Sequence, residues 1–261
     1  MRLPIYQVDA FADKLFGGNP AAICPLPHWL PDATMQAIAA ENNLAETAFF
    51  VREGADYALR WFTPTVEVDL CGHATLASAH IVFKFLEPQR ESVDFRTLKA
   101  GMLTVARRGD MLVMDFPAMP PNPAEPPPGL LAALGGKSRE VLRARDCLVV
   151  YSSAAEVSAL TPDFAALAKI DCWAAIATAP GENGVDFVSR FFAPAKGVPE
   201  DPVTGSSHCT LVPYWAKRLG KTELEARQLS RRGGALRCAL RGDRVSIGGR
   251  AVLYLEGQIT V

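Results

Sequence analysis

Residues 101–110, GMLTVARRGD, and residues 234–243, GALRCALRGD, match at six of ten positions across a spacing of 133 residues. Two glycines earlier in the copies, Gly72 and Gly205, are separated by the same 133 residues. A repeat of this length indicates a duplicated domain, because the units of solenoid proteins are several-fold shorter. The sequence therefore predicts two similar lobes.

A proline-rich segment lies between the two copies. Residues 117–128 contain seven prolines, which remove backbone donors and favour extended chain. We therefore place an N-terminal lobe at residues 1–117, a linker at residues 118–128 and a C-terminal lobe at residues 129–261. The last strand of the chain can cross back to the first lobe.

The composition favours a soluble protein with a large core. The chain has 261 residues, of which 49% are hydrophobic, and a net charge of -1. So small a charge gives no field that would attract nucleic acid or an anionic membrane. No apolar run is long enough for a membrane span, and the N-terminus lacks the features of a signal peptide. We expect a cytoplasmic protein.

Short β-rich runs dominate the chain, and few segments have helical periodicity. We expect a helix over residues 31–43, capped by Asp32, and a helix over residues 73–86 that is apolar on all sides and therefore buried. The repeat partner of that buried helix, residues 206–219, contains Pro213, which predicts a kink or a late start. The simplest arrangement is α+β, with one buried helix per lobe wrapped by strands.

The repeated glycines stand where extended segments turn into helices. The backbone N–H groups of Gly72 and His73, and of Gly205 and Ser206, would then lack helical acceptors. Such donors bind anions, so they could hold a carboxylate or stabilise an enolate-like charge. Alternatively, each glycine only permits a tight turn.

Three side chains near these turns can titrate. Glu46 stands between a helix end and an apolar strand, where burial would favour the neutral carboxyl and allow proton exchange near neutral pH. The alternative is a solvated turn residue. Asp201 can bind a ligand or form an ordinary Asp-Pro turn. His73 has an ordinary pKa near neutrality, or it is a polar residue satisfied at a helix start.

The cysteines and the known cofactor motifs give no sign of a disulfide framework, a zinc site or a bound cofactor. The six cysteines contain no CxxC pair, as expected for reduced thiols rather than disulfides or a zinc site. A helix N-terminus would favour the Cys71 thiolate. However, the repeat partner of Cys71 is Thr204, so a pair of thiols cannot act from matching positions. Nucleotide, zinc-protease and hydrolase motifs are absent, and we expect a site without cofactor or metal.

Several ordered motifs resemble those of the PhzF family of phenazine biosynthesis, and the match runs essentially end to end. They are Val8 to Phe11 with Gly18 to Ala21, Glu41 to Phe49, Glu67 to Thr75, and Asp201 to His208. The family is similar in fold to diaminopimelate epimerase. The resemblance therefore implies two pseudo-symmetric lobes, each a barrel-like sheet around a central helix, with the site between them.

The resemblance also implies an activity. Relatives of this type are cofactor-independent isomerases that move a proton along a small unsaturated carboxylic acid, in phenazine biosynthesis a dihydro-hydroxyanthranilate. By motif, Glu46 would be the general acid and base, with His73 and Asp201 as its polar partners. The substrate carboxylate would be held by Gly72, Gly205 and Ser206, and Asn19 would also line the site.

Two other functions remain open on the sequence. An amino-acid-like epimerase or racemase is suggested by Cys71 and by the fold, although the partner thiol is missing. A non-catalytic protein that binds a small acid is the other alternative. We expect a homodimer, because many small enzymes are two-fold dimers.

Overall fold

The computed structural model describes residues 1–261. The chain forms two compact units, one of residues 1–115 and 248–261, and the other of residues 116–247. The proline-rich residues 118–128, which the sequence suggested as a separate linker, belong to unit 2. Within them, Asn122–Pro123 forms a short strand that pairs with Glu140–Arg143.

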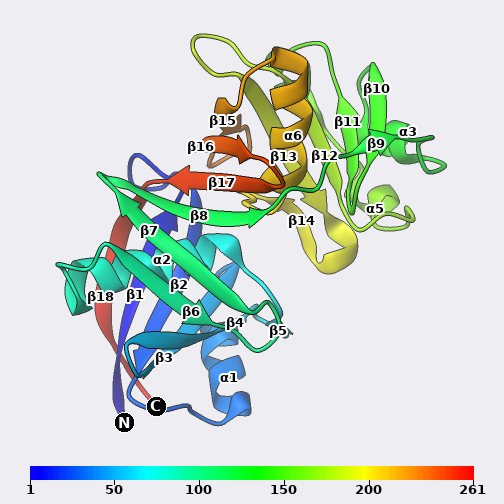
Figure 1. Ribbon diagram of the computed structural model, residues 1–261. Coiled ribbons are helices and arrows are strands. Elements are labelled where there is room, and N and C mark those ends of the chain that lie inside the picture. Colours follow the sequence, from blue (N-terminus) through cyan, green and yellow to red (C-terminus); the bar gives the residue numbers. More distant parts are fainter. The chain divides into compact units, whose positions relative to one another are not determined.

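Unit 1 contains a set of parallel and antiparallel strands and the buried helix α2 (Figure 1). Its neighbouring strands run in the order β18, β1, β2, β3, β4, β6, β7 and β8. The elements are β1 (Arg2–Ala10), β2 (Asn19–Leu26), α1 (Asp32–Asn42), β3 (Glu46–Glu53), β4 (Asp56–Phe62), β5 (Glu67–Val68), α2 (Gly72–Ile81), the π-helix η1 (Val82–Leu86), β6 (Ser92–Arg96), β7 (Met102–Arg108), β8 (Met111–Pro117) and β18 (Ala251–Thr260).

Helix α2 is the centre of unit 1. It contacts β1, β2, β3, β7 and β18, so the sheet curves around it. Of its ten residues, only Gly72 and His80 are not fully buried. A helix that is apolar on all sides gains most of its stability from such burial. The predicted buried helix is therefore confirmed, although its last turn is π-helical.

Unit 2 has its own set of parallel and antiparallel strand pairs and several short helices. Its strands run in the order β9, β10, β11, β12, β13, β15 and β16. The elements are β9 (Asn122–Pro123), α3 (Leu130–Leu134), β10 (Glu140–Arg143), β11 (Cys147–Val150), α4 (Ala154–Ala159), α5 (Phe164–Leu167), β12 (Ala175–Pro180), β13 (Phe187–Ala193), the 3-10 helix η2 (Pro194–Lys196), β14 (Val198–Asp201), α6 (His208–Leu219), β15 (Glu223–Gln228), β16 (Gly234–Arg241) and β17 (Arg244–Gly249).

Strand pairings in the two units follow the same pattern. Strand β4 pairs antiparallel with β5 and parallel with β6, and β13 pairs in the same two ways with β14 and β15. The turns after β7 and β16 have nearly equal backbone angles, with φ of 64° at Gly109 and 63° at Gly242. The sequence repeat thus corresponds to a repeat of strand order.

Two local predictions can be compared with the structure. Helix α6 starts at His208 rather than Ser206, which is the late start that Pro213 predicted as one of two outcomes, and Pro213 lies inside it. Because Pro213 has no N–H, the carbonyl of Cys209 one turn earlier is free, and it accepts a 2.8 Å hydrogen bond from the N–H of Met119. Asp32 does not cap α1; its carboxylate pairs with Arg60 at 2.9 Å. No helix in the structure is both long and apolar enough to cross a membrane.

Candidate functional site

Glu46 is placed by the turn that connects α1 to β3. Helix α1 ends at Asn42, and the capping residue Asn43 has a φ of 49° and a ψ of 36°, a left-handed conformation that asparagine adopts at low cost. The chain then enters β3 at Glu46, opposite Ala21 of the parallel strand β2. The carboxylate therefore sits at the beginning of a central strand, with its side chain 17% exposed.

The N-terminus of α2 supplies the next two groups. Cys71 is the extended residue before the helix, and Gly72 begins the helix as predicted. The N–H groups of the first turn have no acceptor within the helix, so they remain available to an anion. His73, the second residue of α2, is 6% exposed and is directed toward Glu46.

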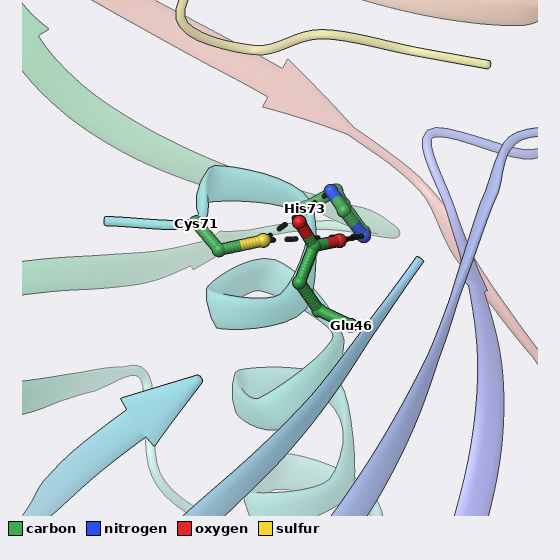
Figure 2. A group of neighbouring side chains, drawn as sticks. All are labelled: Glu46, Cys71 and His73. Carbon is green, nitrogen blue, oxygen red and sulfur yellow. Dashed lines mark hydrogen bonds and ion pairs between the residues drawn. The ribbon is translucent and has the colours of Figure 1, made fainter. Parts of the chain in front are cut away.

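Glu46, Cys71 and His73 form a compact buried cluster (Figure 2). Glu46 Oε2 and His73 Nε2 lie 3.1 Å apart. Cys71 Sγ lies 3.4 Å from His73 Nδ1 and 3.9 Å from Nε2. The distance between Glu46 and His73 is that of an ion pair, but Oε2 makes no well-directed hydrogen bond. Glu46 and His73 are therefore paired by charge rather than by a well-aligned hydrogen bond.

Burial and charge set the protonation of the cluster. Burial disfavours a charged His73 ring, but its interactions with Cys71 and Glu46 outweigh burial and raise the pKa of His73 well above the usual value. Burial also raises the pKa of the Cys71 thiol to about 11, so the thiol is neutral at pH 7. The expected thiolate at Cys71 is wrong, because burial outweighs the helix N-terminus.

Asn19 completes the surroundings of His73. It is the first residue of β2 and is fully buried, and its Nδ2 atom lies 3.2 Å from His73 Nδ1. A neutral ring would accept a hydrogen bond from this amide. For a protonated ring, a half-turn of the amide would present the Asn19 carbonyl oxygen to the Nδ1–H. Asn19 thus contacts His73, the polar partner of Glu46.

Unit 2 contains the other predicted residues, in the loop between β14 and α6. The Asp201 carboxylate accepts a hydrogen bond from the Thr204 hydroxyl. Buried Gln228 connects both ends of this loop, since its Oε1 accepts from Thr204 N–H and its Nε2 donates to the Asp201 carbonyl, both at 2.8 Å. Asp201 is therefore half-buried and held by its own loop.

Gly205 and Ser206 lie in the turn before α6, not in its first helical turn. The Gly205 carbonyl accepts a hydrogen bond of 3.0 Å from His208 N–H, and the Ser206 carbonyl accepts one of 3.2 Å from Cys209 N–H. The expectation that both residues open the helix is wrong. The late start is consistent with Pro213, because proline is tolerated best near the beginning of a helix. A helix that began at Ser206 would place Pro213 farther from its first turn.

Two residues near this loop were not singled out from the sequence. Gln228 has no signal in a single sequence, because a buried glutamine is recognised only by its partners. Arg145 lies close to Ser206, with Nη2 and Oγ 3.5 Å apart, and its guanidinium also pairs with Asp146 and stacks on Trp173. An arginine flanked by aspartate reads as a surface residue in sequence, although here it adds a cation beside Ser206.

Comparison with known proteins identifies the family. The family model described as phenazine biosynthesis-like protein matches residues 8–257. This chain belongs to the PhzF family. It is 54% identical over 259 residues to an uncharacterized isomerase of Pseudomonas aeruginosa, with 99% of each chain covered. It also matches the crystal structure of a PhzF-family protein from Enterococcus faecalis with a TM-score of 0.97 and 48% identity, covering all of both chains.

A more distant structure shares only the fold. A probable proline racemase from Agrobacterium radiobacter, solved with bound carbonate, matches with a TM-score of 0.61 and 10% identity, covering 99% of this chain and 93% of that one. The PhzF-family chain therefore has a mixed α and β fold that is related to those of racemases. The curated relatives support isomerase activity in general.

Proposed function

We propose that this PhzF-family protein is a cofactor-independent isomerase that moves a proton on a small unsaturated carboxylic acid, with Glu46 as acid and base. The observation that carries the proposal is the buried carboxylate–imidazole pair, 3.1 Å apart, at the N-terminus of α2. Family membership and the isomerase names of the relatives support the reaction class.

The state of the cluster suits proton abstraction. An imidazolium beside Glu46 favours the carboxylate anion, which is the form that accepts a proton. Glu46 is also the most exposed member of the cluster, at 17% against 7% for the His73 side chain. A substrate can therefore reach Glu46, while His73 behind it holds the charge.

The proposed reaction conserves atoms and charge. Glu46 removes a proton from a carbon next to the double bond, and the electron pair of that C–H bond delocalises toward the substrate carboxylate. The protonated Glu46 carboxyl exchanges its proton with solvent and delivers a proton to another carbon of the delocalised system, so the double bond moves and Glu46 returns to the carboxylate. The substrate anion needs stabilisation for only as long as Glu46 holds the proton.

Backbone donors are proposed to hold the substrate carboxylate. In unit 1 these are the N–H groups of Gly72 and His73 at the start of α2, where donors carry partial positive charge and favour an anion. In unit 2 we propose the N–H groups of Gly205 and Ser206, which lie in the turn before α6. We propose that Asp201 assists by orienting a polar group of the substrate.

A two-thiol epimerase is less well supported than the isomerase. Such a mechanism needs one thiol that readily becomes a thiolate and a second thiol opposite it. The Cys71 thiol has a pKa of about 11, and the matching position in the repeat is Thr204. The chain therefore lacks both requirements at this pair of positions.

Exchange with heavy water tests the proposal. Purified protein is incubated in D₂O with dihydro-hydroxyanthranilate and with other small unsaturated acids, and the products are followed by proton NMR. An isomerase incorporates deuterium while the double bond moves, whereas an epimerase incorporates it at an inverted centre. Incorporation of no deuterium into any acid of the panel would favour a binding protein instead.

A further inference from the structure

Three different metal-binding atoms converge at the first turn of α2. Cys71 offers a sulfur, His73 an imidazole nitrogen and Glu46 a carboxylate oxygen, and these atoms all lie within 4.8 Å of one another (Figure 2). Sulfur, imidazole nitrogen and carboxylate oxygen are the ligands that zinc takes in proteins. The cluster therefore has the donor set of a three-ligand zinc site with one open position.

The two distances from His73 are close to those around a single ion. With bonds of about 2.0 Å to nitrogen and oxygen and about 2.3 Å to sulfur, tetrahedral zinc separates its ligand atoms by about 3.3 to 3.6 Å. His73 Nε2 lies 3.1 Å from Glu46 Oε2 and 3.9 Å from Cys71 Sγ, on either side of that range. All three atoms lie within 4.8 Å of one another, so a shared ion requires the Cys71 and Glu46 side chains to rotate toward each other.

The surroundings also favour a bound cation. Cys71 and His73 are each 6% exposed and stand at the helix start, and the Glu46 side chain is 17% exposed. A divalent cation would neutralise the buried carboxylate and the thiolate that forms upon binding. The proton balance is simple, since the Cys71 S–H proton and any proton on Nε2 leave for solvent as the metal bonds form.

We infer that Glu46, Cys71 and His73 bind a thiophilic divalent cation such as Zn²⁺, and that the bound ion inhibits the protein by occupying the lone pairs that proton transfer uses. Binding is a property of the cluster alone. Inhibition rests on the proposed function, because it requires Glu46 to be the acting base. The ion is therefore an inhibitor of this site and not its cofactor.

Cobalt titration tests the binding. Co²⁺ replaces Zn²⁺ at such sites, and a thiolate ligand gives it a sulfur-to-metal charge-transfer absorption. The full chain is titrated in a Cys172→Ser background, because the Cys172 and Cys147 thiols contact each other and could bind metal themselves. We expect one equivalent of Co²⁺ to produce the absorption and Zn²⁺ to displace it.

Two cysteine variants make the assignment specific. Cys71→Ser keeps the side-chain size and should remove the charge-transfer band while weakening Zn²⁺ binding at least about 100-fold, since loss of even an outer-shell partner costs about 10- to 100-fold. Cys24→Ala removes another buried thiol of unit 1 and should leave the band and the affinity as they are. Absence of the band, or its survival in Cys71→Ser, overturns the site.

Inhibition by the bound ion is tested separately, by the rate of proton exchange. Zn²⁺ should abolish proton exchange at the concentration at which it displaces Co²⁺, and a chelator should restore it. If the ion binds at Cys71 but exchange is unchanged or faster, inhibition is overturned while the site stands. If Glu46→Gln retains exchange, the proposed function fails, and the cobalt titration still decides the binding.

Discussion

Glu46 is the residue on which the proposed chemistry depends. It differs from the surface carboxylates of unit 1 because its Oε2 atom is buried, lies 3.1 Å from His73 and has no well-directed hydrogen bond. No well-directed donor stands between Oε2 and a bound molecule, so the carboxylate is placed to take a proton from it. The pKa of the neighbouring His73 is raised well above its usual value, so this ring can carry the compensating positive charge.

Glu46→Gln should abolish proton exchange with the fold intact, because it preserves the side-chain shape and removes the base. We expect a loss of about 10² to 10⁴ in rate, the usual contribution of a general acid and base. Deuterium incorporation measured by NMR reports the rate, and circular dichroism reports the fold. Glu41→Gln, on the exposed face of α1, is the matched control and should retain the rate. A well-folded Glu46→Gln protein with substantial exchange would exclude Glu46 as the single base.

Residue roles were only partly predictable from the sequence. Single positions such as Glu46, His73 and Asp201 could be marked as titratable groups near helix starts, and the family resemblance gave them roles. The contact between Glu46 and His73 could not be predicted from local pattern, since it depends on how β3 packs against α2. The protonation of Cys71 was predicted wrongly because burial is a tertiary property and the helix start is a local one.

At the scale of elements, the loop before β2 positions Asn19 through a crowded glycine. Gly18 has a φ of 62°, and a β-carbon there would stand 2.1 Å from the Ala10 carbonyl oxygen. Gly54, in the turn between β3 and β4, has the same φ of 62° but no atom within 4 Å of such a β-carbon. An alanine at either position would thus have the same backbone strain, and only an alanine at Gly18 would also have a steric clash.

Gly18→Ala should destabilise unit 1 much more than Gly54→Ala does. The left-handed conformation alone costs about 1 to 2 kcal/mol for an alanine. At Gly18 the clash with backbone adds about 1 to 3 kcal/mol. Urea unfolding of both variants measures the difference. Equal losses of unfolding free energy in the two variants would mean that the loop before β2 moves aside without cost. That result would contradict the view that Gly18 fixes the position of Asn19.

Strand β2 shows why some elements escaped the sequence analysis. It contains Pro20 and Pro25, and prolines argue against a central strand because they donate no hydrogen bond. In the structure β1 pairs with residues 19–23 of β2, and β3 pairs with residues 21–26. Each proline therefore stands where one of the two neighbours is missing. The periodic strands and the buried helix α2 were predicted because their signal is local.

At the scale of the whole molecule, one histidine with a lowered pKa in each unit links stability to pH. Burial lowers the pKa of His80 in unit 1 and of His208 in unit 2 to about 4 each. The His208 Nδ1–H donates to the Thr204 carbonyl at 2.9 Å, and its Nε2 is buried without a hydrogen-bond partner. A proton on Nε2 would thus have no acceptor, which is why the neutral ring is the folded form.

The folded protein should lose stability between pH 6.5 and pH 4 through these two rings. In the folded protein the pKa of each of these two histidines lies below the ordinary 6.5, so the unfolded chain binds protons first as pH falls. The stability that the two neutral rings contribute is therefore fully present above pH 6.5 and is lost as pH falls toward 4. At pH 5 each ring should lower the free energy of unfolding by about 2 kcal/mol relative to pH 7.

The glutamine in His208→Gln cannot be protonated, so the free energy of unfolding of this variant in urea should fall less between pH 7 and pH 5 than that of the parent. His28→Gln, which removes an exposed histidine, should keep the parental decrease. If His208→Gln loses as much stability as the parent, His208 is not a source of the acid sensitivity.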